Sequence, residues 1–182
     1  FPIPAEMPET TIESLDNEGR GVAPHDGKAI FIEGALPQER VVFSSYRRKP
    51  NYELATAGRI LAANALRVEP RCRHFGICGG CSMQHLGGPG QAAAKQRVLE
   101  NDLWHIGRMR PEVIFPAIHG PSWAYRTRAR LSVRRVPKKG GVLVGFHEKR
   151  SSFIADMDSC EVLPLSVSAL LPLLRSLIGA LS

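Results

Sequence analysis

Four cysteines place the strongest constraint on how this chain of 182 residues can fold. Three of them lie within ten residues in a C-x5-C-x2-C pattern: Cys72, Cys78 and Cys81. The glycines at 79 and 80 allow positive φ angles, and so let the backbone approach an inorganic centre closely. The fourth, Cys160, follows 79 residues after Cys81. If four thiolates share one centre, the fold must bring residue 160 back to the loop at 72–81.

Three kinds of site fit this number of cysteines. Two disulfides are disfavoured, because a basic chain without a secretory signal is expected in the reducing cytoplasm. Structural zinc usually shows two close pairs, whereas this chain has a triplet and a distant single. A triplet with a remote fourth ligand is typical of many [4Fe-4S] sites. The pattern therefore favours a [4Fe-4S] cluster, with a four-cysteine zinc site as the alternative. His74 and His85 are expected to hydrogen-bond near the site rather than bind metal.

Residues 8–63 contain short strand-forming runs separated by turn signals at 17–19 and 26–27. The runs are 10–15, 21–23, 29–32, 41–46 and 52–61. Four or five short strands in so short a stretch predict a small OB-like β-barrel. Such barrels often bind single-stranded nucleic acid through basic and aromatic groups. The candidates here are Tyr46, Arg47, Arg48, Lys49 and Tyr52, with an ordinary solvated loop as the alternative.

Two later segments predict helices, so the expected class is mainly β with some α. At 91–108 the apolar residues at helical spacing are Ala94, Val98, Leu99, Leu103 and Ile106, and they are expected to form a core face. The glycines before them, at 87–90, are expected to form a loop. After Cys160 a second stripe comprises Leu170, Leu174, Leu177, Ile178 and Leu181. This stripe should be buried, in a complete protein against a following domain.

The positive charge is concentrated in one segment. The chain has 24 basic and 17 acidic residues, a net charge of +7. Residues 121–150 contain nine basic residues and one acid, so they alone carry +8. Residues 125–133 alternate as a strand would, with Arg126, Arg128 and Arg130 on one side, and 142–146 read as a partner strand after a turn at 137–141.

An arginine-lined hairpin suits phosphate, because guanidinium groups pair with phosphate oxygens bidentately. A charged solvent face is the alternative. The predicted RNA-binding residues are Arg126, Arg128, Arg130, Arg134, Lys149 and Arg150, with Arg47 and Arg48 from the barrel.

Other functions lack support in the sequence. The apolar stretch 162–181 is interrupted by Pro164, Pro172 and Arg175, so it is a poor membrane span, and no membrane partner is expected. Neither G-x-G-x-x-G after a strand nor G-x-x-x-x-G-K-[ST] occurs, so a nucleotide or adenosyl cofactor has no motif here.

These features resemble the RNA uracil-C5 methyltransferase family, specifically its iron–sulfur 23S rRNA enzymes with an N-terminal TRAM domain. Four stretches carry the resemblance: the strand-rich 8–63, the cysteine loop with Gln84 and His85, the basic 125–133, and 145–160 ending at the fourth cysteine. The loop is similar to the family pattern C-x5-C-G-G-C-x2-Q-H.

The resemblance implies a TRAM-like barrel at 1–66 and an α+β iron–sulfur and RNA-binding domain at 67–182. It also implies 23S rRNA as substrate, S-adenosylmethionine as methyl donor and a monomeric cytoplasmic enzyme. In the family the methyl-transfer residues belong to a C-terminal Rossmann-like domain. The sequence stops before such a domain, so we expect the chain to be an N-terminal portion that binds RNA without methylating it. A stand-alone nucleic-acid-binding module with structural zinc is the alternative.

Overall fold

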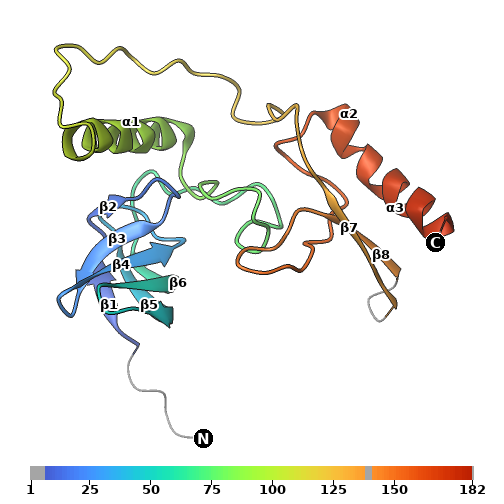
Figure 1. Cartoon of the computed structure of the whole chain (residues 1–182), viewed down its shortest axis with the longest axis horizontal. Coiled ribbons are helices and arrows are strands. Elements are labelled where there is room, and N and C mark those ends of the chain that lie inside the picture. Colours follow the sequence, from blue (N-terminus) through green and yellow to red (C-terminus); the bar gives the residue numbers. More distant parts are fainter. Residues whose placement is uncertain (1–6, 138–140, 182) are drawn as a thin grey trace, which may run out of the picture. The chain divides into compact units, whose positions relative to one another are not determined.

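The computed structural model describes residues 7–137 and 141–181. Contacts between residues divide the chain into two compact units, which are described separately (Figure 1). The first comprises Phe1–Glu69 and His85–Ala117, and the second comprises Pro70–Gln84 and Ile118–Ser182. The cysteine loop therefore groups with the later half of the chain. The domain boundary predicted at residues 66 and 67 stays a prediction.

Six strands form the sheet of the first unit. They are β1 (Glu9–Thr11), β2 (Ser14–Leu15), β3 (Gly21–His25), β4 (Lys28–Glu33), β5 (Arg40–Arg48) and β6 (Tyr52–Ala62). Their order is β1-β5-β6-β4-β3-β2, antiparallel except between β4 and β6. β1 and β2 lie at opposite ends of this order, yet only Ile12 and Glu13 separate them in the chain. The sheet must therefore curl until its ends meet, which makes a small barrel (Figure 1).

The predicted strands and the mainly β class are confirmed, with one change. The run at 10–15 is two short strands, because Ile12 between them turns into the core and is 1% exposed. There its N–H donates to the Glu39 carbonyl at 2.9 Å. The turn predicted at 26–27 joins β3 to β4 with positive φ at both Asp26 and Gly27, the backbone that two-residue hairpins favour.

The helix α1 (Gly88–His105) also belongs to the first unit. It begins three residues before the predicted start, so the expectation that 87–90 is a loop was wrong for 88–90. Pro89 fits there because the first turn of a helix does not need its N–H. The expected core face is only partly buried, since Leu99 is 50% and Ile106 is 78% exposed.

The second unit contains a hairpin and two short helices. These are β7 (Ser132–Val136), β8 (Gly141–Gly145), α2 (Leu165–Ser168) and α3 (Leu170–Ala180). α3 packs against β8, and the buried side chains around them include Val144, Met157, Leu163 and Leu171. The strand expected over 125–133 begins only at Ser132, so the expectation was wrong for 125–131. Part of the predicted turn, 138–140, lies outside the described residues.

Most of the apolar stripe predicted after Cys160 is exposed within this chain, so its expected burial against a following domain stays a prediction. Leu171 is buried against the hairpin, whereas Leu170, Leu173 and Leu177 are 47%, 64% and 57% exposed. Leucines surround the helix, so the spacing alone could not indicate which of them face the core. Among the described helices, none is long and apolar enough to cross a membrane.

Candidate metal centre and nucleic-acid interface

The structure brings all four cysteines to one pocket inside the second unit. The pocket is lined by Cys72, Cys78, Cys81 and Cys160 together with Phe75, Gly80, Gln84, Phe146 and Met157. None of the cysteines forms a disulfide. Cys78 and Cys160 are buried, and the other two are half-buried. Four reduced thiols on one largely apolar pocket form a donor set that suits zinc or an iron–sulfur cluster.

Tight turns shape the cysteine loop. The amide of Phe75 donates to the carbonyl of Cys72 at 3.0 Å, and the amide of Cys78 donates to the carbonyl of His74 at 2.9 Å. The positive φ that the sequence suggested for the glycines at 79 and 80 occurs instead at Gly76, at 90°.

The glycines at 79 and 80 serve close packing. A Cβ on Gly79 would lie 3.0 Å from the His147 carbonyl oxygen, and one on Gly80 would lie 3.1 Å from the Phe146 ring. Larger residues there would force the loop away from the chain that follows β8.

Backbone hydrogen bonds tie the loop to that chain. The amide of Gly79 donates to the carbonyl of His147 at 2.9 Å, and the amide of Lys149 donates to the carbonyl of Ile77 at 2.7 Å. Cys78 also bridges to Glu148 in an antiparallel sense. These bonds therefore fix the cysteine triplet in position against residues 147–149.

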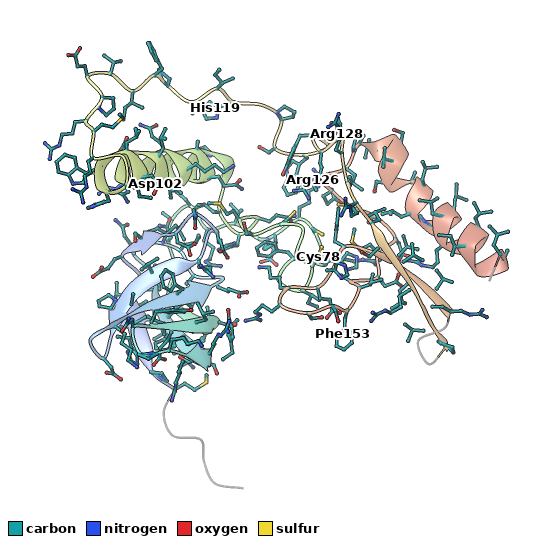
Figure 2. The ribbon with its side chains drawn as sticks, in the orientation of Figure 1. Cys78, Asp102, His119, Arg126, Arg128 and Phe153 are labelled. Carbon is teal, nitrogen blue, oxygen red and sulfur yellow. The ribbon has the colours of Figure 1, made fainter. Side chains whose placement is uncertain are left out.

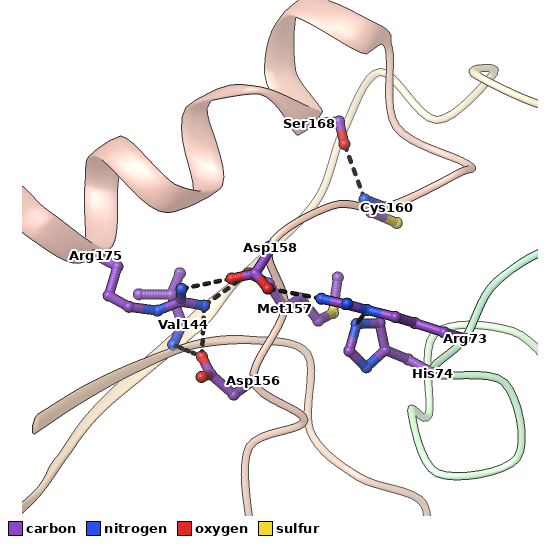
Figure 3. Close-up of polar contacts among 9 residues, drawn as sticks. All are labelled: Arg73, His74, Val144, Asp156, Met157, Asp158, Cys160, Ser168 and Arg175. Atoms are coloured by element: carbon purple, nitrogen blue, oxygen red, sulfur yellow. Dashed lines mark hydrogen bonds and ion pairs between the residues drawn. The ribbon is translucent and has the colours of Figure 1, made fainter. Parts of the chain in front are cut away.

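Figure 3 shows how Cys160 is held. Its amide donates to Ser168 Oγ at 2.8 Å, and both residues are buried. Two residues earlier, Asp158 accepts from Arg175 of α3 at 2.7 Å and from Arg73 of the cysteine loop at 2.6 Å. Arg175 and Arg73 hold the pKa of Asp158 below its ordinary value. One carboxylate thus joins the loop, the approach to Cys160 and the helix.

Electrostatics in the pocket disfavour free thiolates. Burial raises the pKa of the Cys72 and Cys78 thiols, and repulsion from the other cysteines raises it further. Hydrogen bonding from the Gly80 amide to Cys78 Sγ, at 3.4 Å, offsets only part of this effect. Thiolates gathered here need a positive centre to relieve their repulsion.

The spacing of the ligands bears on which centre fits. Among the described residues, no three His, Cys, Asp or Glu side chains are gathered closely enough to hold a single metal ion. Of the two predicted histidines, His74 belongs to the second unit and His85 to the first. His74 Nε2 is 3.2 Å from Arg73 Nε, and burial together with the Arg73 charge lowers the His74 pKa.

The predicted RNA-binding residues have different surroundings. Arg128, Arg130 and Arg134 are exposed, and Arg128 lies on an extended segment (Figure 2). That segment is held by the amides of Ala124 and Arg126, which donate to the carbonyls of Glu161 and Val162 at 3.0 and 2.8 Å.

Two other cations lie over the walls of the cysteine pocket. The Arg126 guanidinium is 5.8 Å from the centre of the Phe146 ring, and Lys149 Nζ is 5.4 Å from that of Phe75. These distances are typical of cation–π contacts. The sequence analysis missed both aromatic residues, although Phe75 lies inside the cysteine motif and Phe146 directly follows the predicted strand.

The two barrel arginines belong to the first unit. Arg47 and Arg48 are exposed at the end of β5 in the first unit, and Arg48 Nε is 3.5 Å from a Glu53 carboxylate oxygen. Arg150, on the turn after Lys149, is exposed with a φ of 58°.

Comparison with known proteins gives close relatives. No family model matches the chain. The 23S rRNA (uracil(1939)-C(5))-methyltransferase RlmD of Aromatoleum aromaticum is 65% identical over 176 residues, covering 97% of this chain and 41% of the relative. The protein of the same name from Nitrosospira multiformis is 64% identical, with 94% and 39% covered. The chain thus spans about two fifths of the length of these curated relatives.

A solved structure has a similar fold. The Pyrococcus abyssi tRNA (uracil-54, C5)-methyltransferase, in complex with S-adenosyl-L-homocysteine, matches with a TM-score of 0.64 and 21% identity, covering 97% of this chain and 37% of that chain. This likeness supports the mainly β fold, and the sequence identity of the curated relatives is far higher. Along nearly its whole length the chain is therefore similar to the 23S rRNA (uracil(1939)-C(5))-methyltransferases named above, of whose length it spans about two fifths.

Proposed function

We propose that this chain is the RNA-recognition and iron–sulfur portion of an S-adenosylmethionine-dependent 23S rRNA (uracil-C5)-methyltransferase. The relatives' names point to uracil 1939 as the target. The observation that carries the proposal is the single pocket lined by four free cysteines, with Arg126 and Lys149 over its aromatic walls. The proposed metal centre and the proposed phosphate-binding surface therefore adjoin each other at the two aromatic rings.

In this proposal Cys72, Cys78, Cys81 and Cys160 bind a [4Fe-4S] cluster. Four sulfurs around one zinc ion, at about 2.3 Å each, lie about 3.8 Å from one another. The four cysteines share one pocket, and a triplet with a remote fourth ligand is typical of many [4Fe-4S] sites, which supports the cluster over zinc. When bound, the cluster supplies a covalent link between the loop and residue 160.

Recognition is assigned to two surfaces. Arg126, Arg128, Arg130, Arg134, Lys149 and Arg150 bind RNA phosphates in the second unit. Arg47 and Arg48 do so on the TRAM-like barrel. The S-adenosylmethionine site and the methyl-transfer chemistry are assigned to parts of the enzyme outside these 182 residues, so labelled S-adenosylmethionine and rRNA mixed with this chain alone should yield no methyl transfer.

Metal analysis tests the cluster. The chain purified without oxygen should contain about four iron and four sulfide per molecule and show visible absorbance. Cys78→Ser should lose both, whereas Ser159→Ala, at an exposed neighbour of Cys160, should retain both. A colourless, well-folded protein with one zinc ion would establish the zinc alternative instead.

Salt dependence tests the RNA surface. On single strands the logarithm of affinity falls with the logarithm of salt by about 0.7 for each phosphate neutralised. Arg128→Gln should reduce this slope by about one such step. Arg97→Gln, at an exposed position on α1, should leave the slope unchanged. An affinity of the wild-type chain that does not depend on salt would refute the assignment.

A further inference from the structure

The turn at residues 147–154 is tightly braced. His147 and Ile154 form an antiparallel bridge that closes it. Inside, the Glu148 amide donates to the Phe153 carbonyl at 2.9 Å, and the Phe153 amide donates to Ser151 Oγ at 2.8 Å. Both the backbone amide and the backbone carbonyl of Phe153 therefore have hydrogen-bond partners, which fix its backbone in the turn.

The cysteine loop fixes this turn from outside. Gly79 and Ile77 each make a backbone hydrogen bond to the turn, through His147 and Lys149. These two bonds fix the position of the turn relative to the cysteine loop, which is the proposed cluster site.

This rigid turn keeps an aromatic ring in solvent. The Phe153 side chain is 61% exposed and points away from the ribbon of its unit (Figure 2). Ile77 beside the turn is 59% exposed. Burying a phenylalanine is favourable, and this ring stays exposed on a braced turn, so it is available to contact a ligand. Lys149 and Arg150, four and three residues before Phe153 on the same turn, are cations.

We propose that Phe153 is a base-stacking residue for single-stranded RNA, with a phosphate of the stacked nucleotide bound by Arg150. This assignment rests on the proposed RNA-binding function and adds a contact to a base. Stacking needs an exposed ring face, and it costs little entropy when the ring is already fixed. Proteins commonly bind unpaired RNA by stacking a base on an aromatic side chain while a nearby cationic side chain contacts the RNA phosphate backbone.

The flanking charges favour RNA over a protein partner. The cores of protein interfaces are depleted of charged residues, and lysine in particular is under-represented. Here the exposed ring is preceded by Lys149 and Arg150, on the same unit that concentrates +8 in residues 121–150. An aromatic–cation pairing of this kind complements a nucleotide better than an apolar protein surface.

The test compares Phe153→Leu with the wild type on a labelled single-stranded oligouridine of about twelve nucleotides, within the range that such surfaces bind. Leucine keeps the apolar bulk and removes the π face. We expect affinity to fall about tenfold with an unchanged salt slope. Phe115→Leu, which replaces an 82% exposed ring of the first unit, should leave affinity unchanged. Unchanged iron content and visible absorbance confirm that the variant retains its fold.

A second oligonucleotide isolates the base. On an oligomer of the same length with abasic sugars, wild type and Phe153→Leu should bind equally, because the backbone is the same and no base can stack. If Phe153→Leu binds oligouridine within twofold of wild type, the inference is wrong, and the ring serves a protein contact or none. If the wild-type chain itself shows no salt-dependent RNA binding, the proposed function fails first, so the two failures are distinguishable.

Discussion

Glu39 is a buried carboxylate whose loss should destabilise the barrel more than any surface change. Its side chain is 0% exposed. It accepts from the amides of Leu36 and Asn64 at 2.8 and 3.0 Å and from Arg67 Nε and Nη2 at 2.5 and 2.6 Å. The carboxylate therefore joins the β4–β5 connection to the segment after β6.

The cost of Glu39→Ala follows from the groups left behind. The buried Leu36 amide without a partner costs about 2 kcal/mol, and the half-buried Asn64 amide about 1 kcal/mol. The guanidinium of Arg67 is 23% exposed, so water recovers part of its lost bonds, and about 1 kcal/mol remains. The sum of about 4 kcal/mol lies within the 3–5 kcal/mol typical of a broken buried pair. Glu13→Ala, at an exposed position, should cost less than about 0.5 kcal/mol.

The pH dependence supplies a second signature. Burial raises the Glu39 pKa, but the hydrogen bonds from Arg67, Asn64 and Leu36 outweigh it and hold the pKa below its ordinary value. A carboxyl with a depressed pKa in the folded state stabilises above its unfolded pKa, about 4.3 for glutamate. That contribution is lost as the pH falls through the folded pKa. The stability difference between wild type and Glu39→Gln should therefore shrink below about pH 4.

Hydrogen exchange across a urea series, followed on peptides from residues 28–62, measures the stability of the barrel directly. Glu39→Ala should lower the opening free energy of these peptides by about 4 kcal/mol. Combining it with Arg67→Ala should cost less than the sum of the single changes, because the double variant leaves neither charge unpaired. A loss no larger than that of Glu13→Ala, or an additive double variant, would refute this account of the buried pair.

Three further predictions concern the second unit. Ser168→Ala should lower the free energy of unfolding, measured with denaturant, by about 1–2 kcal/mol, because the Cys160 amide loses its hydrogen-bond acceptor. Ser166→Ala, at an exposed position, should leave it almost unchanged. Asp158→Asn should release Arg73 and Arg175 and so speed the loss of visible absorbance in a chelator, and high salt should abolish its difference from wild type. Gly145→Ala should lower the free energy of unfolding by about 3 kcal/mol, because its Cβ would overlap the Ala155 carbonyl; Gly120→Ala, in open space, should be neutral.

The sequence predicted the barrel well, because local signals and topology agree there. The Asp26–Gly27 turn favours one hairpin geometry, and alternation in β4 buries Ile30 and Ile32. The sequence also predicted that Cys160 returns to the cysteine loop, because four thiolates can bind one centre only if the fold brings them together. The structure places it there, whereas the metal it would bind stays a prediction.

Two kinds of error have physical causes. Residues 125–131 alternate like a strand, yet none of the strands in the described part of the chain pairs with them. The amides of Ala124 and Arg126 instead donate to the carbonyls of Glu161 and Val162. In α3 the leucines surround the helix, so tertiary packing on β8 selects Leu171. The cation–π contacts over Phe146 and Phe75 join segments 20 and 74 residues apart, a separation that local spacing does not encode.

A metal centre bound by these four cysteines would stabilise the fold mainly by closing a long loop of the chain. Cys160 follows the triplet by 79 to 88 residues, and fixing such a loop removes about 4–5 kcal/mol of chain entropy from the unfolded state. The amide bond to Ser168, worth about 1 kcal/mol, is small beside this. The closed loop contains Arg126, Arg128, Arg130, Lys149 and Phe153. The proposed cluster would thus hold the proposed RNA-binding residues together in a unit with little regular structure, which is a structural role.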